Sequence, residues 1–231
     1  MLSTISAKIY LSPIKTFFSR FNWLHKRFSI ALKIASLSVD LLAKVGYTAE
    51  NVCEDSRLLI ISNPVDKVRF IITKTMDLPT YVECGAADIG IIGKDVLLEE
   101  NKDVYELLDL KFGLCRLMLA VPEAQVRPQL TDYANLRIAT KYPQVTQNFF
   151  SQQSMQVEII KLNGSIELAP MVGLADLIVD IVETGTTLKA NKLQEIHKLH
   201  TCTARLIANR VSFRMKFNRL HKLVCDLQTL I

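Results

Sequence analysis

The first 39 residues contain no acidic residue, although they hold six of the 28 lysines and arginines in the chain. The rest of the chain holds the other 22 basic residues and all 23 acidic residues, so the formal net charge of +5 comes from this N-terminal stretch. Nucleic-acid-binding domains carry a basic face on the folded body, and the balanced body argues against one. We therefore expect no nucleic-acid partner.

We expect residues 1–28 to be a basic N-terminal extension of the folded protein. An organelle transit peptide has a similar composition, rich in basic residues and serine and free of acids. Such composition is weakly diagnostic, so an ordinary extension, or a start codon placed too early, is the simpler interpretation.

Long apolar runs and paired cysteines are also missing. No apolar run approaches the ~18 residues that a membrane-spanning helix needs, so we expect no membrane partner. The cysteines are odd in number and form no C-x-x-C pair, which argues against a disulfide framework or a zinc site and predicts a cytoplasmic location. The five are Cys53, Cys84, Cys115, Cys202 and Cys225.

Short β-branched apolar runs alternate with helix-like segments along the chain, which is typical of an α/β protein. We expect two α/β lobes with a cleft between them, and a chain that returns to the first lobe at its C-terminus. The first lobe covers residues 29–119, the second residues 120–204, and the return segment residues 205–231. In this segment the spacing of apolar residues predicts one helix over residues 212–231.

The stretch 176–191 reads DLIVDIVETGTTLKAN. Its apolar run, residues 177–182, predicts a buried strand of a parallel sheet. Ligands of open α/β sheets bind beyond the carboxyl ends of the strands, which here means residues 183–187. Gly185 permits a tight turn, Thr186 or Thr187 can cap the next helix, and free N–H groups in that turn favour an anion. The loop therefore predicts a phosphate site.

The alternative is an ordinary strand–turn–helix joint, since short motifs match by chance. Asp180 favours the phosphate site, because a carboxylate inside an apolar strand is costly unless it is paired or faces a site. After this loop we expect a polar helix, on which His197 and His200 lie three residues apart at the surface. They have no third ligand for a metal.

From Glu167 the chain reads ELAPMVGLADLIVDIVETGTTL, which resembles the signature of the ATP phosphoribosyltransferase family. The resemblance covers about residues 40 to 231 and implies a fold like that of type II periplasmic binding proteins. Its other segments are DLPTYVECGAADIGIIGKDVL (77–97), YELLDLKFGLCRL (105–117), RIATKYP (137–143) and ARLIANRVSF (204–213).

The resemblance implies the first reaction of histidine biosynthesis, a phosphoribosyl transfer. N1 of the ATP adenine joins C1 of phosphoribosyl pyrophosphate, and pyrophosphate leaves. The length resembles the short form of the family, which implies a regulatory subunit resembling histidyl-tRNA synthetase and a hetero-oligomer. Mg²⁺ is the implied cofactor, held mainly by substrate oxygens and water, and we name no protein ligand for it.

The resemblance also implies roles for particular residues. Asp180 and Glu167 would be the catalytic carboxylates and face the ribose hydroxyls. The residues expected to bind phosphoribosyl pyrophosphate are Glu183, Thr184, Gly185, Thr186 and Thr187.

For ATP, the resemblance points to the first lobe and the hinge. The residues expected there are Lys74, Asp95, Cys115 and Arg116, with Lys141 and Tyr142 as weaker candidates. Two of them have simpler interpretations: Asp95 only caps its helix, and Lys74 only faces solvent.

One segment departs from the family pattern. Family members open with a strand and a loop containing Lys-Gly-Arg, whereas the corresponding loop here has neither Gly nor Arg and offers only Lys33. A damaged or misread start of the gene would explain this loop and the basic extension together. Two hypotheses follow: an active transferase subunit, or a catalytically impaired two-lobed binding protein that retains the phosphate site.

Overall fold

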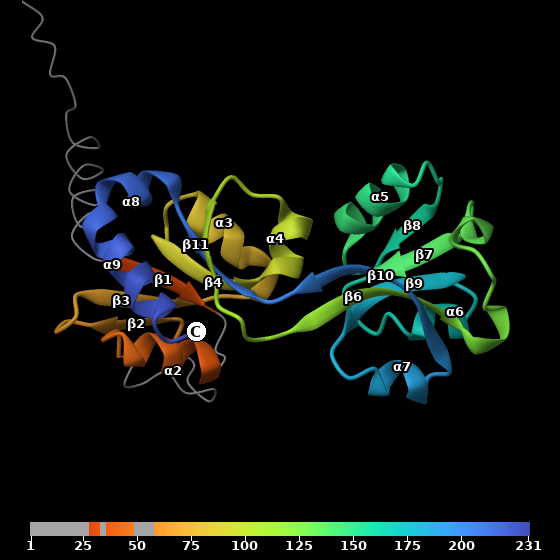
Figure 1. Ribbon diagram of the computed structural model, residues 1–231, viewed down its shortest axis with the longest axis horizontal. Helices are drawn as coiled ribbons and strands as arrows, with labels where there is room; N and C mark the ends of the chain where they lie inside the picture. Colours follow the sequence, from red (N-terminus) through yellow and green to blue (C-terminus); the bar gives the residue numbers. More distant parts are fainter. Residues whose placement is uncertain (1–27, 33–35, 49–57) are drawn as a thin grey trace, which may run out of the picture.

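The computed structural model describes residues 28–32, 36–48 and 58–231. Two mixed β-sheets lie in separate lobes, each flanked by helices, so the chain has the α/β architecture expected from its sequence (Figure 1). The described residues leave out residues 1–27 of the expected extension 1–28, and also Lys33 and Cys53.

The first sheet has six strands in the order β2-β3-β1-β4-β11-β5. Its centre is parallel, because β1 pairs in parallel with both β3 and β4, while β2 and β11 run antiparallel to their neighbours. The strands β2 and β3 form an antiparallel hairpin. The strands are β1 (Phe28–Leu32), β2 (Ile60–Asn63), β3 (Val68–Ile72), β4 (Ile89–Gly93), β5 (Tyr105–Asp109) and β11 (Ala204–Ala208).

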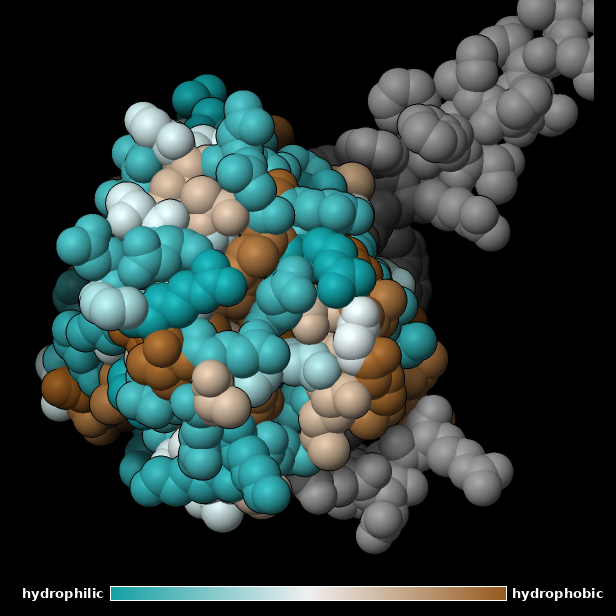
Figure 2. All heavy atoms as spheres, turned by 90° about the vertical axis from the view of Figure 1, so that its right-hand side faces the viewer, coloured by the Kyte–Doolittle hydropathy of each residue, from teal (hydrophilic) through white to brown (hydrophobic). Residues whose placement is uncertain are grey.

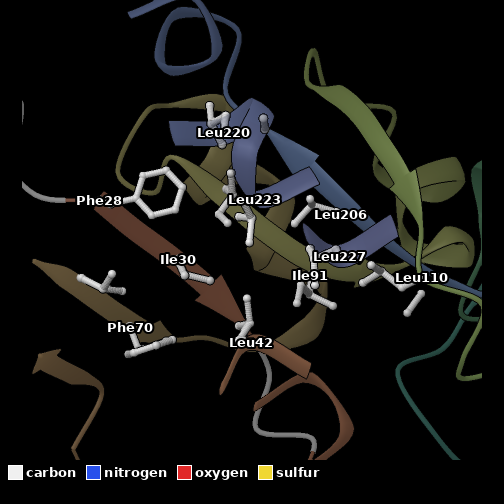
Figure 3. Close-up of a cluster of buried hydrophobic side chains, with 14 of the residues drawn as sticks. Phe28, Ile30, Leu42, Phe70, Ile91, Leu110, Leu206, Leu220, Leu223 and Leu227 are labelled. Carbon is white, nitrogen blue, oxygen red and sulfur yellow. The ribbon is translucent and has the colours of Figure 1, made fainter. Parts of the chain in front are cut away.

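Helices cover both faces of this sheet. One face packs against α2 and α9 through a core in which Phe28, Phe70, Leu42 and Leu223 are at most 1% exposed (Figure 3). The other face packs against α3 and α4. The helices of this lobe are α2 (Ser36–Lys44), α3 (Leu78–Glu83), α4 (Lys94–Glu100), α8 (Arg210–Met215) and α9 (Phe217–Gln228).

The return segment differs from the expected single helix over residues 212–231. It begins at Arg210, where the Ser212 N–H donates to the Asn209 side chain as a cap, and it breaks at Lys216 into α8 and α9. The Lys216 ammonium contacts both oxygens of Asp88, each at 2.8 Å. The return of the chain to the first lobe is confirmed.

The second sheet has five strands in the order β10-β6-β9-β7-β8. Its β7–α5–β8–α6–β9 part is a βαβαβ unit with parallel pairing, but β9 pairs antiparallel with β6, so the sheet is mixed rather than parallel. The elements are β6 (Cys115–Pro122), β7 (Arg137–Thr140), α5 (Pro143–Gln152), β8 (Glu158–Lys161), α6 (Leu168–Met171), β9 (Leu177–Val182), α7 (Thr186–Ala190) and β10 (Leu193–Cys202).

The prediction of a polar helix that carries His197 and His200 is wrong. Both residues lie on β10, a ten-residue strand that pairs antiparallel with β6 and whose register shifts twice along its length. Both histidines are exposed, as expected of surface residues.

Two short segments connect the lobes. The chain leaves the first sheet after Asp109, enters the second at Cys115, and returns through Thr203. The boundary expected after residue 119 falls inside β6, which belongs to the second sheet throughout.

The outer face of the second lobe is mostly hydrophilic, with apolar side chains in small separate patches (Figure 2). In the described part of the chain no helix is long and apolar enough to cross a membrane.

Candidate functional site

The loop after β9 makes a tight turn at Gly185. This glycine has φ +78°, a left-handed conformation, and an added Cβ would lie 3.0 Å from Glu195 Oε1. The helix α7 then starts at Thr186, with Gly185 at the N-cap position. The prediction that Thr186 or Thr187 caps this helix is therefore wrong; instead, the Thr186 N–H donates to the Thr184 hydroxyl at 3.5 Å. The threonine hydroxyls stay available, since Thr184, Thr186 and Thr187 are all exposed.

A hollow of ≈ 250 Å³ joins this loop to the two candidate catalytic carboxylates. It is lined by Glu167, Asp180, Ile181, Val182, Glu183, Thr184, Gly185, Thr187 and Leu188. Asp180 reaches it from β9, and Glu167 from the start of α6. Of the loop residues expected to bind phosphate, Thr186 alone does not line it, but its hydroxyl lies 3.0 Å from that of Thr184.

Asp180 has a pKa that its surroundings shift. Burial raises the pKa of Asp180 above its usual range, and the nearby Glu167 charge raises it further. The Ile181 N–H, which donates to Asp180 Oδ1 at 2.8 Å, and the Lys141 charge act in the opposite direction without cancelling the rise. Two carboxylates crowded in this way favour a cationic group between them.

An ion pair supports the loop from behind. Arg116 on β6 pairs with Glu195 on β10, at 2.9 Å from Nη1 to Oε2 and 3.3 Å from Nη2 to Oε1. Glu195 Oε1 is the atom nearest to a Cβ added at Gly185. The ion pair therefore restrains the side chain that limits the space at this turn. Arg116, expected to bind ATP, therefore lies beside the candidate phosphate loop. Glu195 was not predicted, because its segment was expected to be a helix.

A second pocket, of ≈ 450 Å³, lies between the lobes. It is lined by residues 73–77, which follow β3 of the first sheet, and by Lys141, which follows β7 of the second. The carboxyl ends of parallel strands from both sheets meet here, as expected for a ligand cleft. Lys74 is exposed in this pocket, and Thr73 Oγ1 is buried without a hydrogen-bond partner among the described residues.

Asp95 is buried beside the junction of the lobes, with 6% of its surface exposed. Its Oδ2 accepts a hydrogen bond from the Tyr142 hydroxyl at 3.0 Å. Asp95 lies in the first turn of α4, whose N-cap position is Gly93, and Asp95 therefore does not cap this helix. Burial, together with the Asp95 charge and this hydrogen bond, holds the pKa of Tyr142 well above its usual range.

Cys115 and Cys202 face each other across β6 and β10, next to the crossing between the lobes. Both are buried free thiols. A hydrogen bond from the Cys202 thiol lowers the pKa of Cys115, whereas the same bond and burial raise the pKa of Cys202. Cys115 and Arg116 line neither of the two pockets.

Within the described ranges, no three His, Cys, Asp or Glu side chains form a group that could hold a metal ion. Any metal here would therefore take most of its ligands from elsewhere, such as substrate oxygens and water.

The sequence matches known proteins over most of its length. Residues 74–229 match the family described as HisG: ATP phosphoribosyltransferase. The ATP phosphoribosyltransferase of Desulfitobacterium hafniense is 51% identical over 206 residues, which cover 86% of this chain and 92% of the relative. That of Halalkalibacterium halodurans is 52% identical over 193 residues, with 83% and 89% covered.

Solved structures resemble the fold. A chain of the ATP phosphoribosyl transferase (HisG:HisZ) complex from Thermotoga maritima superposes with a TM-score of 0.75 at 32% identity, covering 87% of this chain and 97% of that one. A substrate-binding protein of an amino acid ABC transporter reaches 0.58 at 11% identity, covering 88% and 92%. The second likeness shows the fold alone, and it confirms the expected periplasmic-binding-protein-like architecture.

Proposed function

Because this chain belongs to the ATP phosphoribosyltransferase family, we propose that the two pockets are the two halves of a phosphoribosyl-transfer site. The chain is a catalytic subunit of this enzyme, a transferase of histidine biosynthesis. It transfers the phosphoribosyl group of phosphoribosyl pyrophosphate to N1 of ATP and releases pyrophosphate. The observation that carries the assignment of the halves is the hollow that joins Glu167 and Asp180 to the threonine loop.

The β9 loop would hold phosphoribosyl pyrophosphate. Three exposed threonine hydroxyls and the backbone N–H groups around Gly185 suit the 5-phosphate, because they are neutral hydrogen-bond donors. The turn that presents them is possible because glycine has no Cβ. Asp180 and Glu167 would face the ribose hydroxyls. As pyrophosphate leaves, positive charge develops on the ribose, and preorganised carboxylates stabilise such a transition state. Glu183, at the start of the loop, lines the same hollow.

ATP would bind toward the first lobe. The pocket between the lobes supports this half, because Lys74 and Lys141 offer ammonium groups that suit a triphosphate. Asp95 does not line this pocket, but the Tyr142 hydroxyl of the second lobe holds its side chain in a fixed position. We keep Cys115 and Arg116 in the proposed ATP set, although Arg116 pairs with Glu195 beside the phosphate loop.

Mg²⁺ is the proposed cofactor. Among the described residues, the hollow offers single carboxylates, at Glu167, Asp180 and Glu183, rather than a group of three ligands, and no thiol or imidazole lines it. Mg²⁺ commonly binds through one or two carboxylates together with substrate phosphates. When bound, it would neutralise the charge of the departing pyrophosphate.

We also propose a regulatory partner and a location. The Thermotoga maritima structure that this chain resembles is a HisG:HisZ complex, which supports a hetero-oligomer with a subunit resembling histidyl-tRNA synthetase. A cytoplasmic location is supported by the free thiols of all four described cysteines, since reducing compartments keep cysteines unpaired.

The test is pyrophosphate release from ATP and phosphoribosyl pyrophosphate with Mg²⁺, first with this chain alone and then with a candidate synthetase-like subunit. Turnover that requires the partner would support a catalytic subunit of a hetero-oligomer. Silence in both arms, with phosphoribosyl pyrophosphate still bound, would favour the catalytically impaired binding protein.

A matched pair of variants tests the site. Asp180→Asn should abolish turnover, whereas Asp176→Asn should keep it, because Asp176 pairs with Arg137 at the other end of β9. Equal turnover in the two variants would contradict the assignment of Asp180.

A further inference from the structure

We propose that Tyr142 is a positioning residue, which orients the Asp95 carboxylate for the nucleotide from the opposite lobe. The inference rests on the proposed placement of ATP at Asp95. Asp95 follows β4 of the first sheet, whereas Tyr142 follows β7 of the second, 47 residues further along the chain. The nucleotide half of the site would therefore be complete only when the two lobes pack as they do here.

The bond between the two residues is shielded from water. Asp95 is 6% exposed and Tyr142 3%, and the Tyr142 hydroxyl donates to Asp95 Oδ2 at 3.0 Å. A hydrogen bond to a buried charge contributes more than one at the surface, and its loss leaves a costly unsatisfied group. The bond therefore holds this carboxylate oxygen in one direction.

The backbone constrains the other oxygen. A Cβ added to Gly93 would overlap Asp95 Oδ1, so the carboxylate is folded against the glycine that precedes α4. With one oxygen against Gly93 and the other on Tyr142, the orientation of the carboxylate is determined on both sides. Neither contact was indicated by the spacing of the residues in the sequence.

Tyr142 is itself held rigidly. Its backbone N–H donates to Thr140 Oγ1 at 2.9 Å, and its carbonyl accepts from Thr146 Oγ1 at 2.7 Å. Its neighbour Lys141 lines the pocket between the lobes together with Lys74. Tyr142 thus stands beside the pocket proposed for ATP, in a position that the second lobe sets.

A second polar contact between the lobes provides a control. Glu99 of α4 accepts hydrogen bonds from the backbone N–H groups of Gln144 and Val145, at 3.1 and 3.0 Å, in the first turn of α5. It bridges the same two lobes and lines neither pocket. Loss of Glu99 therefore weakens lobe packing without touching Asp95.

The experiment compares Tyr142→Phe with Glu99→Ala and with Tyr133→Phe. Tyr133 is a matched tyrosine, 2% exposed, whose hydroxyl accepts a hydrogen bond from the Arg127 N–H in the second lobe. Calorimetry would measure ATP affinity for each chain, and steady-state kinetics would measure KM for both substrates.

We expect Tyr142→Phe to raise the Kd and the KM for ATP about tenfold and to change the KM for phosphoribosyl pyrophosphate less than twofold. Both control variants should keep the wild-type affinity for ATP within twofold. An unchanged ATP affinity in Tyr142→Phe would overturn the inference. So would an equal loss in Glu99→Ala, since Tyr142 would then act only by joining the lobes.

The two proposals can fail separately. A wild-type chain that binds ATP but never turns over would contradict the proposed function, while the binding comparison would still decide the role of Tyr142. A wild-type chain that binds no ATP would overturn both.

Discussion

At the scale of single residues, Gly185 has little freedom to change. Its φ of +78° suits glycine, and an added Cβ would meet Glu195 Oε1 at 3.0 Å, where the Arg116 ion pair restrains that side chain. Gly185→Val should displace the loop and lower the affinity for phosphoribosyl pyrophosphate at least tenfold, which corresponds to about 1.4 kcal/mol. Calorimetry would measure this loss.

Gly164→Val is the matched control, because a Cβ at Gly164 would meet no atom within 4 Å. If Gly185→Val left the affinity for phosphoribosyl pyrophosphate unchanged, the assignment of this loop as its binding site would be contradicted.

The second prediction at this scale concerns pH. Burial, and then the Glu167 charge, raise the pKa of Asp180, so activity that needs the ionised carboxylate falls as the pH drops through that raised value. Glu167→Gln removes the second cause and should lower the pKa of Asp180. We expect the acid limb of the kcat/KM profile for phosphoribosyl pyrophosphate to move to lower pH, whatever the absolute rate. A limb that stays in place, or that moves upward, would contradict the coupling of the two carboxylates.

The predicted site residues that the structure brings together are mostly close in the sequence. The threonine loop and Asp180 stand within a few residues at the end of one apolar strand, and the structure places them in one hollow with Glu167. Glu195 gave no such signal, and Tyr142 was only a weaker candidate from the resemblance. Their partners Arg116 and Asp95 are 79 and 47 residues away. Contacts of that separation depend on strand order and lobe packing, which the residue pattern does not encode.

At the scale of elements, β10 shows why a strand was mistaken for a helix. Its apolar residues recur every three residues, at Leu193, Ile196 and Leu199, and all three are buried or partly buried. This spacing imitates the apolar face of a helix. The register with β6 shifts between Glu195 and His197 and again between Lys198 and His200, so the alternation of a regular strand is broken. By contrast, strand 177–182 agrees with its expected ends, because a continuous buried run has no such ambiguity.

The junction of α8 and α9 yields a prediction of stability. Asp88, 7% exposed at its side chain, accepts hydrogen bonds from the Ser29 N–H at 2.7 Å, from the Ser212 hydroxyl at 2.6 Å and from Lys216 at 2.8 Å. It thus joins β1 to the return helices. Asp88→Ala removes the carboxylate that these three donors share, and we expect the free energy of unfolding in urea to fall by about 3 kcal/mol.

Asp103→Ala is the control for this variant. Asp103 pairs with Arg210 at 2.8 Å, but both side chains are more than half exposed, and such surface pairs contribute less than about 1 kcal/mol. Equal losses in the two variants would show that the Asp88 network has no special role.

At the scale of the whole molecule, Glu99 joins the lobes by capping α5 from outside. Loss of a helix cap costs about 1 kcal/mol, so Glu99→Ala should lower the urea midpoint by a corresponding amount. Glu100→Ala, one residue later on α4, should leave it unchanged, because no hydrogen bond or ion pair of Glu100 occurs in the part of the chain that the structure describes. If neither substitution changed the urea midpoint, the contact between Glu99 and α5 would not contribute to stability.

The position of β11 has a consequence for synthesis on the ribosome. All five strands of the second sheet precede residue 203, whereas β11 lies between β4 and β5 in the first sheet. Until residues 204–208 emerge, β5 has no partner in its sheet and β4 keeps one open edge. Open edges pair readily with other chains. A nascent or truncated chain that ends before residue 204 should therefore aggregate through its first lobe while its second lobe can already fold.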